Sequence, residues 1–324
     1  MKIKQTLLFV CTCIFSLLSY AVNNSMVGIA SNVPKAIKNT DIPAEKNYIF
    51  FFAHGLAATK NQVNLFLKEH KKNNLALYNN NYIIDLPHIS FDFPDSIHAI
   101  DPSAWFLPLR KLIANLIRGN YDQTSFAQDN EIELLHAIYN TQAPKDKKLI
   151  FGGISRGGSI FFTGTHLFTS ENTAAAFTES PYASIADVIN FKRRQFRIES
   201  IISEDQGQAL MEFLFGKYKR VGVRPIDCVQ YVDKNIPLLI IASRSDMLVP
   251  WESSFLLYQE LRAVGHKKAH FLLLEEGEHG FLLSGPNGKH YQQVVHAFFR
   301  YYNVPHDNVL AEAGHHHFIT NVLP

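Results

Sequence analysis

The sequence predicts an α/β domain, built as a doubly wound, mostly parallel sheet with a helical cap inserted into it. Short apolar runs, each long enough only for a buried strand, alternate along the chain with longer amphipathic segments. The length of 324 residues suits one large domain of this kind. A stretch of about fifty residues late in the chain breaks the alternation, and we interpret it as a cap inserted between two strands of the sheet.

Each element follows from a local pattern. Strands are expected where apolar runs are bounded by turn residues, at 47–52, 82–84, 88–91, 149–151, 172–178, 237–242 and 268–274. Helices are expected where apolar residues recur at helical spacing, at 63–67, 103–118, 131–139, 253–264 and 292–302, and directly after Ser155. Residues from about 182 to 235 predict a largely helical cap, which sets substrate choice.

The N-terminus has the pattern of a secretory signal peptide at residues 1–21. Lys2 and Lys4 precede an apolar run from Leu7 to Leu18, and small residues predict cleavage after Ala21. A retained membrane anchor is the alternative, although the run is short for a span. We therefore expect an exported protein, periplasmic or secreted, with a leader at 22–46, a domain at 47–324 and no stable membrane span after cleavage.

Charge and cysteine content exclude several classes of protein. Removing residues 1–21 removes two lysines and no acid, so the formal charge falls from +2 to 0. Nothing basic then remains to suggest nucleic acid as a partner. Only Cys228 survives processing, so no internal disulfide is expected, and this residue is interpreted as a small buried apolar side chain.

The most informative stretch is 148–159, which reads KLIFGGISRGGS. A buried strand, a glycine-flanked turn with Ser155 at its tip and a following helix are the context in which G-x-S-x-G indicates a nucleophile. Gly153 and Gly157 allow the strand and the helix to pass closely. The helix that begins after Ser155 directs N–H groups toward developing negative charge.

An acid and a base for this serine follow later in the chain. Asp246 comes after the strand at 237–242, at the carboxyl edge of a parallel sheet, where sites are built. A turn aspartate that caps the next helix is the alternative interpretation. His279 lies between Gly277 and Gly280, in a loop directly after the last strand. Asp246 would hold this imidazole in one tautomer and stabilise its charged form.

Other histidines and acids have less suitable settings. His266 precedes the last strand, His270 lies inside it, and His290 leads into the final helix; Glu275, Glu276 and Glu278 are expected to be solvated or to shape the loop. His315, His316 and His317 have no accompanying cysteine or carboxylate cluster and predict a solvated tail. The basic run 192–194 is interpreted as a solvated helix face. No metal and no organic cofactor are expected.

Four segments together resemble the α/β-hydrolase superfamily of serine hydrolases, near its prolyl oligopeptidase and dienelactone hydrolase branches. They are HGLAATKNQ from His54, GISRGGS from Gly153, SRSDMLVP from Ser243 and GEHGF from Gly277. The resemblance implies a catalytic triad in the order Ser155, Asp246, His279. It also argues against Asp92 as the acid, because the acid of this fold follows the serine.

The same resemblance assigns two backbone N–H groups to an oxyanion hole. Arg156, directly after the nucleophile, supplies one, and Leu56, in the loop after the strand at 47–52, supplies the other. The side chain of His54 is interpreted as packed within that loop.

The predicted function is hydrolysis of a carboxylic ester by an exported serine hydrolase, through an acyl-enzyme intermediate. The expected substrate is a small-molecule ester, lipid-derived given the aromatic cap. A peptidase or amidase of the same fold, acting on a peptide-like substrate, is one alternative. A non-catalytic binding protein that kept the fold is another.

Overall fold

The computed structural model describes residues 47–56, 58–68, 81–93 and 124–322. The predicted signal peptide, the leader and the helix expected at 103–118 lie outside these residues. No helix of the described segments is long and apolar enough to cross a membrane.

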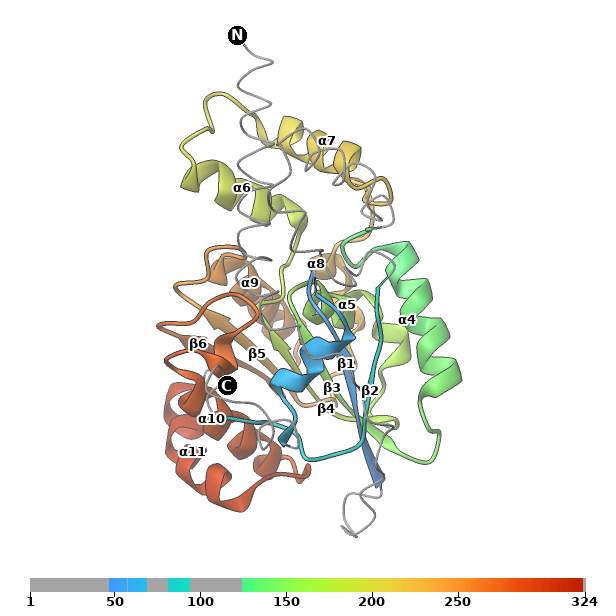
Figure 1. The fold of residues 1–324 in the computed structure, drawn as a ribbon, viewed down its shortest axis with the longest axis vertical. Helices are drawn as coiled ribbons and strands as arrows, with labels where there is room; N and C mark the ends of the chain where they lie inside the picture. Colours follow the sequence, from blue (N-terminus) through green and yellow to red (C-terminus); the bar gives the residue numbers. More distant parts are fainter. Residues whose placement is uncertain (1–46, 57, 69–80, 94–123, 323–324) are drawn as a thin grey trace, which may run out of the picture.

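The described segments contain a sheet of six strands, all parallel, in the order β2-β1-β3-β4-β5-β6. The strands are β1 (Tyr48–Ala53), β2 (His88–Ser90), β3 (Lys148–Ile154), β4 (Thr173–Glu179), β5 (Leu238–Ser243) and β6 (Ala269–Leu274). The chain passes from β1 to one side to form β2, and then adds every later strand on the other side (Figure 1). The strand order therefore reverses between β1 and β3.

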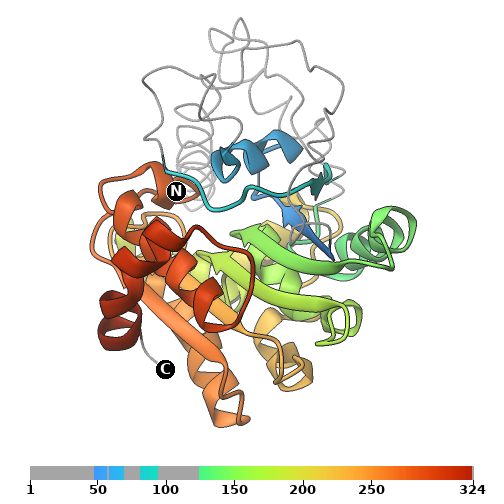
Figure 2. The ribbon, with the colours of Figure 1, turned by 90° about the horizontal axis from the view of Figure 1, so that it is seen from below.

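Helices cover both faces of this sheet (Figure 2). One face packs against α4 (Asp129–Gln142), α5 (Arg156–Thr163), α8 (Pro225–Cys228) and α9 (Trp251–Ala263), and the other against η2 (Lys60–Leu65), α10 (Gly288–Tyr301) and α11 (Asn308–Asn321). Short 3-10 turns, η5 (Thr165–Leu167), η6 (Val229–Tyr231) and η7 (Leu282–Ser284), complete the connections. The predicted fold class is thus confirmed.

The run of aromatic residues in β1 explains how one strand serves two cores. Successive side chains of a strand point to opposite faces, so Phe51 packs into the α4/α5/α9 core while Phe50 and Phe52 pack into the α10/α11 core. All three are fully buried. A central strand buried on both faces reads as a continuous apolar run, as this one does.

The segment predicted as a cap contains α6 (Ile185–Gln195) and α7 (Glu204–Leu214), which stand beyond the carboxyl edge of the sheet (Figure 1). Ser184 caps α6, and Ser203 forms a capping box with Gln206 at the start of α7. An apolar cluster that includes Phe126 and Phe215 packs beneath these helices.

Three local expectations were wrong. The predicted strand at 82–84 is reduced to one bridge between Ile84 and Leu67. The C-terminal tail is not an irregular segment but the helix α11, because Asp307 accepts N–H groups of the first turn and apolar residues pack on α10; His315 and His316 are nevertheless exposed, as predicted. The basic run 192–194 is not uniformly solvated, because Lys192 is buried and its ammonium donates to the carbonyl of Met247.

Candidate active site

The residues singled out in the sequence meet at one edge of the sheet. Ser155 follows β3, Leu56 follows β1, Asp246 follows β5 and His279 follows β6, so all four lie beyond the carboxyl ends of parallel strands. Ser155 and Leu56 flank the point where the strand order reverses. Open parallel sheets place ligands in the crevice at such a reversal.

Ser155 occupies a sharp, strained turn between β3 and α5. Its backbone has φ 54° and ψ −116°, a conformation that costs a non-glycine residue about 1–3 kcal/mol. A Cβ on Gly153 would lie 2.3 Å from the carbonyl oxygen of Gly157, and one on Gly157 would lie 2.0 Å from that of Ala53. Both glycines are therefore required for the strand, turn and helix to pack this closely.

The surrounding backbone holds this turn in place. The N–H of Ser155 donates to the carbonyl of Glu179 at 2.7 Å, and its own carbonyl accepts from the N–H of Ser159 at 2.8 Å. Arg156 is the first residue of α5. The first N–H groups of a helix have no intrahelical acceptor and carry partial positive charge, so this end of α5 suits a developing anion.

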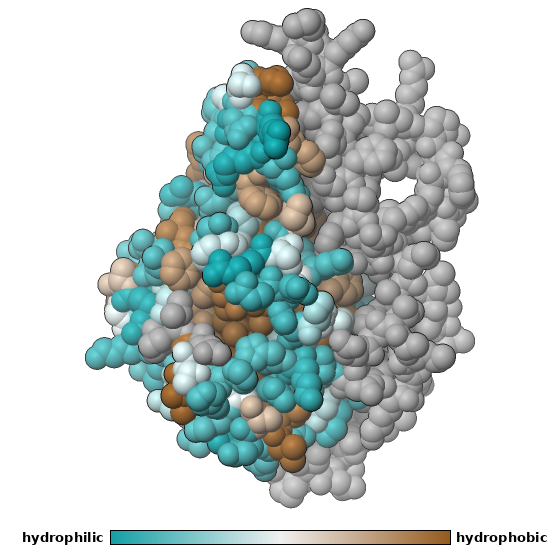
Figure 3. Space-filling model, turned by 90° about the vertical axis from the view of Figure 1, so that its left-hand side faces the viewer, coloured by the Kyte–Doolittle hydropathy of each residue, from teal (hydrophilic) through white to brown (hydrophobic). Residues whose placement is uncertain are grey.

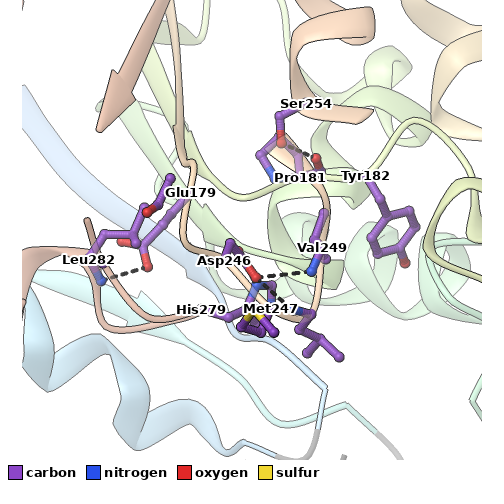
Figure 4. Close-up of polar contacts among 12 residues, drawn as sticks. Glu179, Pro181, Tyr182, Asp246, Met247, Val249, Ser254, His279 and Leu282 are labelled. Carbon is purple, nitrogen blue, oxygen red and sulfur yellow. Dashed lines mark hydrogen bonds and ion pairs between the residues drawn. The ribbon is translucent and has the colours of Figure 1, made fainter. Parts of the chain in front are cut away.

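Asp246 and His279 form a buried hydrogen-bonded pair. The carboxylate accepts from Nδ1 of His279 at 2.7 Å through one oxygen (Figure 4). Its other oxygen accepts the N–H groups of Leu248 and Val249, at 2.8 and 3.0 Å. A carboxylate that accepts at Nδ1 fixes the proton there and leaves Nε2 as the nitrogen that can take a proton. The interpretation of Asp246 as a turn residue is also correct, because its carboxylate accepts backbone N–H groups of its own turn as well as the imidazole.

Glycines shape the loop that carries His279. Gly277 and Gly280 have φ of 155° and 76°, and Gly280 directly follows the histidine. The positive φ at Gly280 bends the chain where a side chain would be strained. His279 is 4 % exposed, and Ser155 is 5 % exposed.

The rival residues have other partners. Asp92 accepts the N–H of Lys60 at 2.7 Å, and its carboxylate lies 3.6 Å from the ammonium of the same residue. His270 bonds the hydroxyl of Tyr302 at 2.7 Å. Burial lowers the pKa of both His266 and His270 to about 4, so these two histidines are neutral at pH 7. Glu275 pairs with Arg244 at the surface.

Sequence reasoning missed a second buried carboxyl beside the pair. Glu179, at the end of β4, is 1 % exposed and accepts the N–H of Leu282 at 3.3 Å (Figure 4). Burial, with a smaller contribution from the charge of Asp246, raises its pKa to about 8. The hydroxyl of Tyr291 is buried beside this carboxyl, without a hydrogen bond of ordinary geometry. The position of Glu179 at the end of an apolar strand was the signal available in the sequence.

The loop of Leu56 is held by side-chain hydrogen bonds that sequence reasoning did not identify. The carbonyl of Gly55 accepts from Nδ1 of His54 at 2.6 Å and from a guanidinium nitrogen of Arg156 at 3.3 Å. The N–H of Gly55 donates to Gln62 at 2.9 Å. Within the described residues, no three histidine, cysteine or carboxylate side chains gather as a metal site.

No protein-family model and no curated protein matches the chain. Among solved structures, it is similar to the acylaminoacyl peptidase of Pyrococcus horikoshii, at 14 % identity and a TM-score of 0.45, over 81 % of this chain and 37 % of that one. An esterase of Pyrococcus furiosus aligns at 14 % identity and a TM-score of 0.48, over 79 % and 82 % of the two chains. A lipase-esterase related protein of Clostridium acetobutylicum aligns at 17 % identity and a TM-score of 0.43, over 78 % of this chain and 94 % of that one.

The chain thus spans 37 % of the length of the peptidase that it matches. Because these identities and TM-scores are low, the fold is assigned from the chain's own topology. A parallel sheet that reverses its order between β1 and β3, with a strained serine turn at the reversal, is the α/β-hydrolase fold.

Proposed function

We propose that this chain of α/β-hydrolase fold is a serine hydrolase that cleaves a carboxylic ester. The observation that carries the proposal is the buried pair of Asp246 and His279, at the same sheet edge as the strained turn of Ser155. A hydroxyl raised on such a turn, with an oriented imidazole from a neighbouring loop, is the arrangement that activates serine.

In the proposed reaction, Nε2 of His279 takes the proton of Ser155 as its oxygen attacks the ester carbonyl. The resulting oxyanion accepts the N–H groups of Arg156 and Leu56. The C–O bond of the ester then breaks, and the imidazolium returns the proton to the departing alcohol. A water, deprotonated by the same imidazole, then attacks the acyl-enzyme carbonyl. The bond to the serine oxygen breaks, the imidazolium returns the proton to that oxygen, and the acid and free Ser155 are released.

An apolar acyl group is the favoured substrate part. Leu56 and Leu248 are partly buried at the edge of the apolar cluster beneath the cap, together with Val188 and Met211. Hydrophobic side chains are also visible in a hollow below the cap helices, on a face that is mostly hydrophilic (Figure 3). Apolar side chains beneath the cap favour an acyl chain over a charged peptide as the part of the substrate bound there.

The test is labelling of the purified protein with a fluorophosphonate, followed by peptide mapping and by hydrolysis of p-nitrophenyl esters. We expect the label on Ser155, its loss in Ser155→Ala and His279→Ala, and turnover of acyl esters. Turnover of aminoacyl amides with none of acyl esters would contradict the ester assignment in favour of a peptidase. A folded, unlabelled wild-type protein would contradict catalysis altogether.

We also infer export, from the signal pattern of residues 1–21. The support is the basic start, the apolar run and the small residues before Ala21. N-terminal sequencing of protein from an export-competent host should begin at Val22. An intact N-terminus in the cytosolic fraction would contradict export.

A further inference from the structure

We infer that three buried side chains, those of Arg156, Glu131 and His54, position the peptide group between Gly55 and Leu56 and thereby aim the second oxyanion donor. The inference rests on the proposed function, because it assigns a role to groups around the same serine. It makes Arg156 the residue that sets both donors, one through its own backbone and the other through its guanidinium.

The geometry of the peptide group is the first step. The carbonyl of Gly55 and the N–H of Leu56 belong to one planar, trans unit and point in opposite directions. Fixing the direction of the carbonyl therefore fixes the direction of the N–H. That carbonyl accepts two hydrogen bonds, from Nδ1 of His54 at 2.6 Å and from Arg156 at 3.3 Å. The peptide is held from the side opposite to its N–H.

His54 can donate to this carbonyl because its tautomer is fixed from the other side of the ring. Its Nε2 accepts the N–H of Phe93 at 3.1 Å, which requires a lone pair there and places the proton on Nδ1. The ring is fully buried and lies edge-on to the ring of Phe93, with 4.9 Å between centroids. A packed loop histidine thus has a defined donor role.

Arg156 reaches the same carbonyl because a buried acid holds its guanidinium. Glu131 lies 3.3 Å from it, and both side chains are at most 1 % exposed. The two carboxylate oxygens of Glu131 also accept the N–H groups of Ser125 and Ala127, at 3.0 and 2.7 Å. The guanidinium packs over the ring of Phe93, 4.1 Å from its centroid.

This arrangement is more than a structural ion pair, because a buried pair alone contributes little net stability. The guanidinium of Arg156 donates to the carbonyl of Gly55, and the same peptide group carries the predicted donor, the N–H of Leu56. Arg156 also directly follows Ser155 in sequence. A donor preorganised before the reaction lowers the barrier more than one that must reorient as charge develops. We therefore assign positioning roles to Arg156, Glu131 and His54.

The experiment compares wild type with the double variant Arg156→Met/Glu131→Leu, which removes both charges and leaves neither buried alone. Esters of one alcohol give kcat and KM, and an alkyl boronic acid, whose tetrahedral serine adduct carries an oxygen in the oxyanion position, gives the affinity for a transition-state mimic. We expect kcat and boronic-acid affinity each to fall about tenfold to hundredfold, with KM within about twofold.

The matched control is Arg262→Met. Arg262 also donates to backbone carbonyls, those of His266 and Lys267, but at the opposite edge of the sheet. It should leave kcat, KM and boronic-acid affinity unchanged. Circular dichroism and thermal unfolding verify the fold of each variant.

A second variant keeps the test decisive if the double variant does not fold. Arg156→Lys retains the charge opposite Glu131 but loses the planar fork that reaches the Gly55 carbonyl, so we expect a smaller fall in kcat, again without a change in KM. Wild-type kcat and boronic-acid affinity in a folded variant would overturn the inference. A wild-type protein that neither labels nor hydrolyses would instead refute the proposed function, so the two failures are distinguishable.

Discussion

Glu179 gives the prediction that most directly tests the electrostatics of this site. Burial raises the pKa of its carboxyl from 4.5 to about 8, so the folded chain retains a proton that the unfolded chain releases. For an acid whose folded pKa is raised, the free energy of unfolding is unaffected below pH 4.5 and falls as pH rises from 4.5 to about 8. Each pH unit in this window lowers the free energy of unfolding by about 1.4 kcal/mol. At pH 7 the accumulated cost is about 3 kcal/mol.

Glu179→Gln removes this cost without changing the shape of the group. Glutamine resembles the protonated acid, and its amide oxygen can accept the N–H of Leu282 as Glu179 does. We expect the free energy of unfolding to rise by about 3 kcal/mol at pH 7 and by less than about 1 kcal/mol at pH 5. Urea unfolding followed by fluorescence, in buffers from pH 5 to pH 8, measures the difference.

The control is Glu133→Gln, which removes an exposed carboxyl from α4 and leaves the buried carboxyl of Glu179 in place. A pH dependence in this variant as large as that of Glu179→Gln would contradict burial as its cause. A difference between wild type and Glu179→Gln that stays constant across pH would refute the reasoning, because a packing effect does not titrate. A difference that shrinks as pH rises would show that Glu179 is ionised and stabilised in the folded chain.

Two further pairs of substitutions test the turn and the acid. Gly157→Ala puts a Cβ 2.0 Å from the carbonyl oxygen of Ala53, so α5 must move away from β1. We expect the free energy of unfolding to fall by about 3 kcal/mol or more and most ester turnover to be lost. Gly158→Ala, whose Cβ would lie 3.2 Å from the carbonyl oxygen of Gly153, should cause a smaller loss. Asp246→Asn should lower kcat by about 10³- to 10⁴-fold in ester assays, whereas Asp92→Asn should keep most activity. The reverse result would reassign the acid.

The fold was predictable where local pattern and tertiary burial agree. The aromatic run of β1 reads as a strand because both of its faces are buried, and the apolar runs of β3 and β5 read the same way. The C-terminal helix was missed because its adjacent histidines suggested a solvated tail. The signal available in the sequence was Asp307, an aspartate placed before a segment that contains alanine and leucine. Its side chain caps the helix by accepting N–H groups of the first turn.

The candidate site was predictable to the extent that its demands are local. A serine on a strained turn needs glycine on both sides, so Gly153 and Gly157 mark it in the sequence itself. His279 is similarly marked by the glycine that follows it. Asp246 lies 33 positions before His279, and only the order of strands indicated that they would meet.

The polar side chains that were missed share a physical cause. Arg156 and Glu131 lie 25 positions apart, and Lys192 reaches a carbonyl 55 positions away. Burial makes each contact consequential, because a polar group without a partner inside the protein is costly. No periodicity or spacing encodes such a pair, and composition assigns both members to the surface. The same low-polarity interior that hides these partners from sequence reasoning strengthens their hydrogen bonds. The peptide between Gly55 and Leu56, which we propose carries an oxyanion donor, is therefore held by the least predictable part of the site.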